Sequence, residues 1–275
     1  MGKEQKINKD TVVCISIAAK PGNFGANFHN SAYKHLGLDW VYLPRKVVRT
    51  VDLERAINGV RVFGIKGCSV SMPHKEIVIQ YLDNLDSSAE RIGAVNTIVQ
   101  NENGSLKGYN TDFYGARKAL EKANIKGKEV LMTGAGGVAK AVGFAVKELG
   151  GLLTIANRTY DRARELSEKL NAKVIPWEQV SNSSGYLLIN ATSVGMKDPN
   201  KMVVKEKVIR NFNVIMDVVI YPSETKLLRI SKEKGKIIIP GTLMCVYQAA
   251  EQFKIYTGFN APKKVIDDTL KAFKK

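Results

Sequence analysis

KEVLMTGAGGVAKAVGFAVKELG (residues 128–150) reads as a strand, a glycine turn and a helix in that order. Gly134, Gly136 and Ala139 fit the pattern G-x-G-x-x-G/A, which is informative here because it follows a predicted strand and opens a helix. Gly134 permits a tight turn, Gly136 lets a pyrophosphate approach the backbone, and Ala139 allows close helix–strand packing. The helix start offers free N–H groups and a positive dipole end to phosphates. The stretch therefore predicts a dinucleotide-binding unit.

The next strand, LLTIAN (152–157), indicates which dinucleotide is bound. A site that prefers NAD places Asp or Glu about 20 residues after the first glycine, to hold the ribose 2′-OH. Here Arg158 and Thr159 follow Asn157, and Arg162 comes one helical turn later. Two guanidinium groups and a hydroxyl at a helix start suit a 2′-phosphate. We therefore predict that NADP is bound by Gly134, Ala135, Gly136, Gly137, Val138, Ala139, Asn157, Arg158, Thr159 and Arg162.

Strand-like and helix-like segments alternate on both sides of this turn, which predicts βαβ units and mostly parallel sheets. The expected strands are 11–18, 40–44, 62–71, 94–100, 128–134, 152–157, 186–193, 213–220 and 235–241. The expected helices include 26–37, 50–59, 73–85, 113–125, 244–258 and 261–275, and Asn103-Gly104 predicts a hairpin turn. We therefore expect an α/β protein with a first domain at 1–110, completed by helices at 243–275, and a Rossmann-type domain at 111–242.

Composition excludes several classes of protein. The chain has 275 residues, 44% of them hydrophobic and 8% aromatic, which is ordinary for a globular protein. No stretch approaches the roughly 20 apolar residues that span a bilayer, and the N-terminus MGKEQKINKDT is a polar lead-in without a signal core. We expect a cytoplasmic protein without a membrane partner.

Charge and cysteines are the remaining global features. The three cysteines lie far apart and predict neither disulfides nor a metal site. The net charge of +16 comes from scattered Lys and Arg, without a nucleic-acid-binding motif. We favour a lysine-rich solvated surface, which also attracts anionic substrate and cofactor, and expect no nucleic-acid partner.

Seven short motifs, in order, resemble those of the shikimate dehydrogenase family. They are SVSMPHKE (69–76), AVNT (94–97), GYNTD (108–112), GAGGVAKA (134–141), NRTYDRA (157–163), NATSVGM (190–196) and GTLMCVYQAAEQF (241–253). The resemblance implies reduction of 3-dehydroshikimate to shikimate with NADPH, in a cleft between two α/β domains. It implies no metal, and a monomer or homodimer.

The resemblance assigns roles to single residues. Its Lys/Asp catalytic pair matches Lys75 and Asp112, and interconverting an alcohol and a ketone requires such proton handling. We expect Lys75 to begin a helix after Pro73, and Asp112 to lie at a helix start. It also implies substrate contacts at Asn23, Gly25, Ser71, Asn96 and Gln248, and cofactor contacts at Thr192 and Gly241.

Three departures from the family pattern concern the substrate end. The loop NFGANFHN (23–30) has Asn23 and Gly25 where two serines usually bind the substrate carboxylate. Ser69 replaces an asparagine, and Ile220 stands where a tyrosine is usual, with Tyr221 one place later. We therefore expect an NADP-dependent dehydrogenase of shikimate or a close cyclic polyhydroxy acid, weak on shikimate itself. The alternatives are a quinate/shikimate-type dehydrogenase with another physiological substrate and a non-catalytic NADP-binding sensor.

Overall fold

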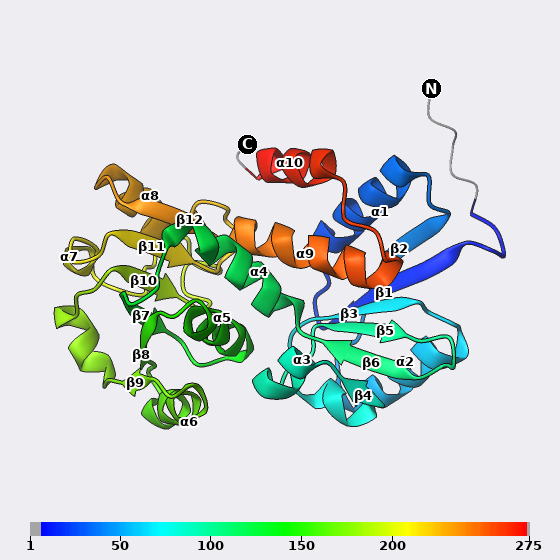
Figure 1. Cartoon of the computed structure of the whole chain (residues 1–275), viewed down its shortest axis with the longest axis horizontal. Coiled ribbons are helices and arrows are strands. Elements are labelled where there is room, and N and C mark those ends of the chain that lie inside the picture. Colours follow the sequence, from blue (N-terminus) through cyan, green and yellow to red (C-terminus); the bar gives the residue numbers. More distant parts are fainter. Residues whose placement is uncertain (1–6, 274–275) are drawn as a thin grey trace. The chain divides into compact units, whose positions relative to one another are not determined.

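A computed structural model describes residues 7–273, and its elements group into two compact units (Figure 1). Unit 1 holds the described chain up to Thr111 together with Ala249–Lys271. Unit 2 holds Asp112–Gln248 and the described residues from Ala272 on. The expected division at 110/111 and 242/243 lies near these boundaries. The first residues of the polar N-terminal lead-in and the last two of the expected C-terminal helix lie outside the described residues.

Unit 1 is built on one mixed sheet with the order β2-β1-β3-β5-β6-β4. Its strands are β1 (Val12–Ala18), β2 (Trp40–Lys46), β3 (Gly67–Val70), β4 (Asn84–Leu85), β5 (Thr97–Gln100) and β6 (Leu106–Tyr109). β1 pairs in parallel with β2 and β3, whereas β5 runs antiparallel to β3 and β6. The predicted hairpin is confirmed, and Gly104 in its turn has a φ of 80°.

The helices of unit 1 are α1 (Phe24–Leu36), η1 (Thr50–Asp52), α2 (Leu53–Val62), η2 (Ile77–Tyr81), α3 (Ser87–Ile92) and most of α10 (Lys263–Ala272), with the second half of α9 (Gly241–Thr257).

The two faces of this sheet differ in chemistry. Cys68 and Val70 lie in an apolar core with residues of α2 and α3. Because side chains alternate along a strand, Ser69 points to the opposite face, in register with Ser16 and Thr97.

One expected helix in unit 1 is wrong. Residues 73–85 form a turn, the short 3-10 helix η2 and the strand β4 instead of a helix. The carbonyl of Lys75, which a helix would use for Ile79, instead accepts a hydrogen bond from the Val95 N–H at 2.8 Å. A hydrogen bond to a segment distant in sequence therefore overrides the helical pattern. The predicted strand at 62–71 begins only at Gly67, since α2 extends to Val62.

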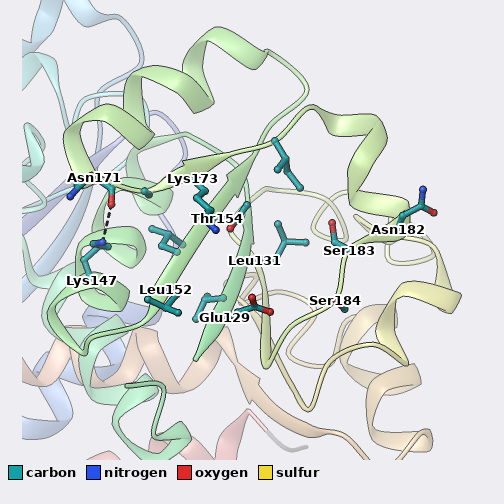
Figure 2. A pocket seen from close by; sticks show the side chains of 14 residues that line it. Glu129, Leu131, Lys147, Leu152, Thr154, Asn171, Lys173, Asn182, Ser183 and Ser184 are labelled. Atoms are coloured by element: carbon teal, nitrogen blue, oxygen red, sulfur yellow. Dashed lines mark hydrogen bonds between the residues drawn. The ribbon is translucent and has the colours of Figure 1, made fainter. Parts of the chain in front are cut away.

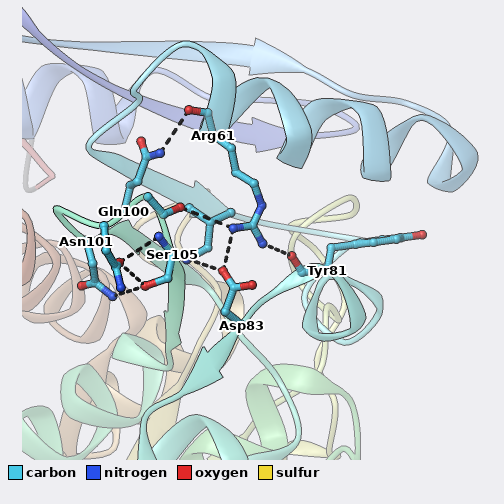
Figure 3. A network of polar contacts seen from close by, with 9 residues as sticks. Arg61, Tyr81, Asp83, Gln100, Asn101 and Ser105 are labelled. Atoms are coloured by element: carbon cyan, nitrogen blue, oxygen red, sulfur yellow. Dashed lines mark hydrogen bonds and ion pairs between the residues drawn. The ribbon is translucent and has the colours of Figure 1, made fainter.

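A polar network joins α2 to the β5–β6 hairpin (Figure 3). The Arg61 guanidinium lies 2.6 Å from Asp83 and also donates to the Tyr81 carbonyl at 3.0 Å. Asp83 accepts from the Leu106 N–H, and Gln100 donates to the Arg61 carbonyl at 3.1 Å. Hydrogen bonding to Arg61 holds the pKa of Asp83 below its ordinary value. The network fixes the hairpin whose strands carry the residues around Asn96.

Unit 2 contains a fully parallel sheet with the order β12-β11-β10-β7-β8-β9. Its strands are β7 (Glu129–Thr133), β8 (Leu152–Ala156), β9 (Lys173–Val174), β10 (Leu187–Asn190), β11 (Val214–Asp217) and β12 (Ile237–Pro240). The helices are α4 (Thr111–Leu120), whose first residue belongs to unit 1, η3 (Glu121–Ala123), α5 (Gly137–Glu148), α6 (Tyr160–Leu170), η4 (Trp177–Asn182), α7 (Glu206–Ile209), α8 (Lys226–Glu233) and the first half of α9. This is the predicted Rossmann-type architecture, and the strand order reverses between β7 and β10.

Among residues 7–273, no helix is long and apolar enough to cross a membrane. Within the same residues, no group of three or more His, Cys, Asp or Glu side chains is arranged to hold a metal ion.

Candidate functional site

The segment that carries Lys75 is a turn anchored by its backbone. Ser71 donates its N–H to the Ile17 carbonyl at 2.9 Å, and His74 donates its N–H to the Ser71 carbonyl at 3.0 Å. The buried His74 ring adds a 2.8 Å hydrogen bond between Nε2 and the Val47 carbonyl. Ser71 is exposed and Lys75 half-buried. The turn therefore holds Lys75 in a fixed place although it is not helical as expected.

Asn96 ties this turn to the segment that leads to Asp112. The carbonyl of Asn96 accepts from the Val70 N–H at 2.8 Å. The carbonyl of Lys75 accepts from the N–H of Val95, the residue before Asn96. The Asn96 side chain is only 3% exposed, and its Oδ1 accepts from the Thr111 N–H at 2.8 Å and from Thr111 Oγ1 at 3.0 Å. These bonds use Oδ1, so Nδ2 of Asn96 is the group available to donate to a ligand.

Asp112 follows Thr111 directly and is the second residue of α4, as expected from the sequence. Its side chain is 8% exposed. Asp112 is the first residue of unit 2, whereas Lys75 lies in unit 1. The Lys75 carbonyl accepts a hydrogen bond from the Val95 N–H, and the Thr111 N–H, one residue before Asp112, donates to Asn96 Oδ1.

Helix α9 contributes a glutamine that the sequence motifs did not single out. Gln252 is 5% exposed, and its Nε2 donates to the Asn96 carbonyl at 3.1 Å and to Thr97 Oγ1 at 2.8 Å. The expected Gln248 lies one turn earlier on α9, half-buried in unit 2, with its Cβ and backbone N–H against Gly115. Gln252 follows Gln248 by four residues, a spacing that places both on the same side of a helix, and this was the signal in the sequence for Gln252.

Asn23 and Gly25 lie at the start of α1. Asn23 is the N-cap residue but forms no side-chain cap hydrogen bond, and no acidic residue occupies the first turn. A Cβ atom on Gly25 would lie only 3.0 Å from the hydroxyl of Tyr42. That hydroxyl donates to Ser69 Oγ at 2.7 Å. The structure therefore brings Gly25 together with Tyr42 and Ser69, and Tyr42 had no sequence signal.

The glycine turn of unit 2 has the geometry that a dinucleotide requires. Gly134 has a φ of 112°, and a Cβ on it would lie 2.6 Å from the Ala191 carbonyl oxygen. A Cβ on Gly136 or Gly137 would meet nothing within 4 Å, so open space faces the start of α5. Ala139 is fully buried against the sheet. Close packing behind the turn and open space before it fit a pyrophosphate approaching the helix start.

The predicted 2′-phosphate residues surround the start of α6. Asn157 donates from Nδ2 to the Thr159 carbonyl at 2.9 Å, which fixes the turn after β8. Thr159 is the N-cap of α6, and its side chain forms no cap hydrogen bond. Arg158 and Arg162 are exposed, and neither forms an ion pair among the described residues. Two unpaired guanidinium groups and an uncommitted hydroxyl are therefore placed where a phosphate could bind.

A buried carboxyl group holds the loop after β10, where Thr192 lies. Asn190 Oδ1 accepts from Thr192 Oγ1 at 2.7 Å, and Asn190 Nδ2 donates to Asp217 Oδ1 at 3.0 Å. Asp217 also accepts from Thr225 Oγ1 at 2.7 Å. Burial raises the pKa of Asp217 to about 6. The network fixes Thr192 at the carboxyl end of the sheet, where the strand order reverses.

Two further predicted positions lie after β11 and β12. Gly241 begins α9, and a Cβ on it would lie 2.5 Å from the Val218 carbonyl carbon, so the position requires glycine for close backbone approach. β11 ends at Asp217, so Ile220 lies beyond the strand, which the sequence predicted to run over 213–220. Tyr221 is 59% exposed, and its ring centroid lies 5.7 Å from that of Phe273.

A hollow of about 640 Å³ lies elsewhere in unit 2 (Figure 2). It is lined by the first residues of β7 and β8, by Lys173 and by Ser183 and Ser184. Lys147 Nζ donates to the Asn171 carbonyl at its rim, at 2.9 Å. These are the amino ends of parallel strands, whereas the glycine turn follows the carboxyl ends. The hollow contains none of the predicted cofactor residues.

Comparison with known proteins gives consistent matches along the chain. Residues 24–98 match the shikimate dehydrogenase substrate binding domain, residues 116–230 match the shikimate / quinate 5-dehydrogenase family and residues 241–271 match the shikimate 5'-dehydrogenase C-terminal domain. A shikimate dehydrogenase-like protein of Haemophilus influenzae is 41% identical over 91% of this chain and 92% of its own. A shikimate dehydrogenase (NADP(+)) of Pyrococcus abyssi is 42% identical over 84% of this chain and 86% of its own.

Solved structures agree with these sequence matches. The structure of shikimate 5-dehydrogenase from Thermus thermophilus, in complex with NADP(H) and shikimate, is 31% identical with a TM-score of 0.86. It covers 95% of this chain and 98% of its own.

Proposed function

Because the chain belongs to the shikimate dehydrogenase family, we propose that it interconverts shikimate, or a close cyclic polyhydroxy acid, and the 3-dehydro ketone. It is an NADP-dependent oxidoreductase that acts on a CH–OH group. The observation that carries the proposal is the anchoring around Asn96, which holds the Lys75 turn through the Val95 N–H and the start of α4 through Thr111.

The residues of unit 2 fit the cofactor. The open space before Gly136 and Gly137 and the unpaired Arg158 and Arg162 would receive the pyrophosphate and the 2′-phosphate. Thr192 and Gly241 complete the proposed set of contacts. When bound, NADP supplies the hydride chemistry, and the protein supplies orientation and proton handling.

Proton handling falls to Lys75 and Asp112. One of the pair accepts the hydroxyl proton when the alcohol is oxidised and returns it when the ketone is reduced, because the oxygen must lose or gain a proton as the hydride moves. Asn96 Nδ2 and the Ser71 hydroxyl orient the ring hydroxyl groups, and Gln248 adds a third polar contact. We propose weak activity on shikimate, since neither Asn23 nor Gly25 supplies a serine hydroxyl to the carboxylate.

The test is a panel assay of the purified protein with NADP and NAD against shikimate, quinate and related cyclic hydroxy acids. Lys75→Ala should lower kcat by about 10²–10⁴-fold, the usual contribution of general acid–base catalysis. Lys122→Ala, which removes an exposed lysine of η3, is the matched control and should keep the wild-type rate.

Three outcomes separate the alternatives. NADPH formation with quinate and not with shikimate would assign another physiological substrate within the same family. The absence of turnover with every acid, in a protein that still binds NADP, would favour the non-catalytic sensor. Equal rates for the wild type and Lys75→Ala would remove the lysine from the mechanism.

A further inference from the structure

The space beside Gly25 is occupied by the hydroxyl of a buried tyrosine. A Cβ on Gly25 would lie 3.0 Å from Tyr42 Oη, 3.1 Å from Cε1 and 3.2 Å from Cζ, which is tighter than most real contacts of this kind. Gly25 lies in α1 without a positive φ, so it is needed for space and not for backbone conformation. A serine at this position would displace the Tyr42 ring.

Burial, a ring contact and a hydrogen bond hold the Tyr42 side chain in place. Its side chain is 2% exposed, and its ring stacks on that of His29 with centroids 4.6 Å apart and planes 11° apart. The hydroxyl donates to Ser69 Oγ at 2.7 Å. The Tyr42 hydroxyl is therefore a fixed donor in contact with both Gly25 and Ser69.

A second tyrosine, Tyr256 of α9, also reaches Ser69. Tyr256 Oη lies 3.1 Å from Ser69 Oγ, and Tyr256 is also buried, at 2% exposed. A buried hydroxyl that does not donate is costly, and Ser69 is the hydrogen-bond partner of Tyr256 in the described chain. We therefore assign Tyr256 as a donor to Ser69. Both lone pairs of Ser69 Oγ then accept, and its own proton is left to donate.

Ser69 is placed to use that proton. It is half-buried, unlike the buried residues on either side of it in β3, and it faces the same side of the sheet as Thr97. Two hydrogen bonds into its oxygen polarise the O–H and strengthen it as a donor. Burial raises the pKa of Tyr42 and of Tyr256 above the ordinary value, so both remain neutral donors.

We propose that Ser69 determines specificity at the acid end of the substrate, donating to the carboxylate the hydrogen bond that no hydroxyl at positions 23 and 25 supplies. Tyr42 and Tyr256 are positioning residues that aim and polarise this donor. The inference rests on the proposed function, because it takes a cyclic hydroxy acid as the ligand.

The principal test is Ser69→Ala, assayed for shikimate oxidation with NADP. The KM for shikimate should rise about 10-fold or more, as expected for a hydrogen bond to a charged group. The kcat and the KM for NADP should stay within about twofold. Tyr42→Phe keeps the ring on His29 but removes the donor, and should raise the KM for shikimate by a smaller factor, about 3-fold.

Two controls separate this role from a structural one. Ser69→Thr keeps the hydroxyl in a strand that suits threonine, and should restore the wild-type KM. Tyr186→Phe removes a tyrosine hydroxyl that bonds the Ala123 carbonyl in unit 2, and should leave the KM unchanged. The affinity for the ring triol that lacks the carboxylate should be the same in wild type and Ser69→Ala. Equal loss of affinity for the acid and for the triol would overturn the proposal.

Calorimetric titration of shikimate into the protein with NADP separates this inference from the proposed reaction. If the wild type shows no turnover but binds shikimate, and Ser69→Ala binds it about 10-fold more weakly, the donor role stands while the reaction falls. Equal affinity in both proteins, or no binding to either, would overturn the donor role.

Discussion

The starts of α5 and α1 both carry glycine, and the two helices use it for opposite purposes. At the start of α5, a Cβ on Gly136 or Gly137 would meet nothing within 4 Å. At the start of α1, a Cβ on Gly25 would press against the Tyr42 hydroxyl at 3.0 Å. The first glycines face open space, whereas the second leaves room for another side chain of the protein. A glycine at a helix start is therefore not by itself a sign of a binding site.

The largest predicted effect concerns His29, a fully buried side chain of α1. Burial lowers the pKa of His29 from 6.5 to about 3 and outweighs the opposite, raising effect of Gln252. Below pH 6.5 the unfolded chain therefore binds a proton that the folded chain rejects, so stability present above pH 6.5 is lost as the pH falls. The full loss is about 5 kcal/mol, of which about 3 kcal/mol appears by about pH 4.5.

His29→Phe should remove this loss while keeping a ring on Tyr42. Urea unfolding at about pH 7.5 and pH 4.5 measures this loss, as the difference in unfolding free energy between wild type and variant at each pH. His35→Phe, on the exposed side of the same helix, should retain the wild-type pH dependence. An unchanged pH dependence in His29→Phe would show that another group dominates.

The next largest effect concerns the open glycine. Gly136→Val should weaken NADP binding by about 100-fold, because the side chain would fill the space through which the pyrophosphate reaches the backbone. Gly136 has extended backbone, φ −88° and ψ −175°, which valine adopts readily, so the thermal midpoint should hardly change. Titration of NADP, followed by protein fluorescence, measures the affinity. A variant that binds NADP normally would place the cofactor elsewhere.

A third helix start, that of α6, sharpens the cofactor assignment. Arg158→Ala should weaken NADP about 30-fold and NAD less than about 3-fold, since only NADP carries the 2′-phosphate that the guanidinium would bind. Arg164→Ala is the matched control, because Arg164 lies on the same helix 3.4 Å from Asp161. Parallel titrations with both dinucleotides measure the ratio, and equal weakening of the two would rule out the 2′-phosphate contact.

The smallest predicted effect tests directly whether Gly25 leaves space for Tyr42. Gly25→Ala gains helix propensity of up to about 1 kcal/mol but meets Tyr42, and Tyr42→Phe removes the closest contact. The two substitutions should therefore be coupled by about 1 kcal/mol in unfolding free energy, with alanine better tolerated in the Tyr42→Phe background. A double-mutant cycle by urea unfolding measures the coupling. Additive changes would mean that Gly25 is not kept for space.

The difference between these helix starts explains which parts of the structure could be predicted from the sequence. The turn at Gly134–Ala139 is local, so its spacing predicted the fold of unit 2. The contact between Gly25 and Tyr42 joins α1 to β2, and nothing in either segment reports it. The Lys75 turn escaped prediction for the same reason, because Val95 takes the carbonyl that a helix needs. Gln252 reaches Asn96 across 156 residues of chain.

The division of the chain between the two units has a consequence for synthesis. The main body of unit 2 runs without interruption from Asp112 to Gln248, whereas unit 1 needs Ala249–Lys271 as well as the described residues up to Thr111. A ribosome releases the chain from its N-terminus, and domains fold as units. Ser69 therefore waits for Tyr256, and Asn96 for Gln252, until the body of unit 2 has been made. Unit 1, whose first strands are translated before unit 2, is therefore completed after it.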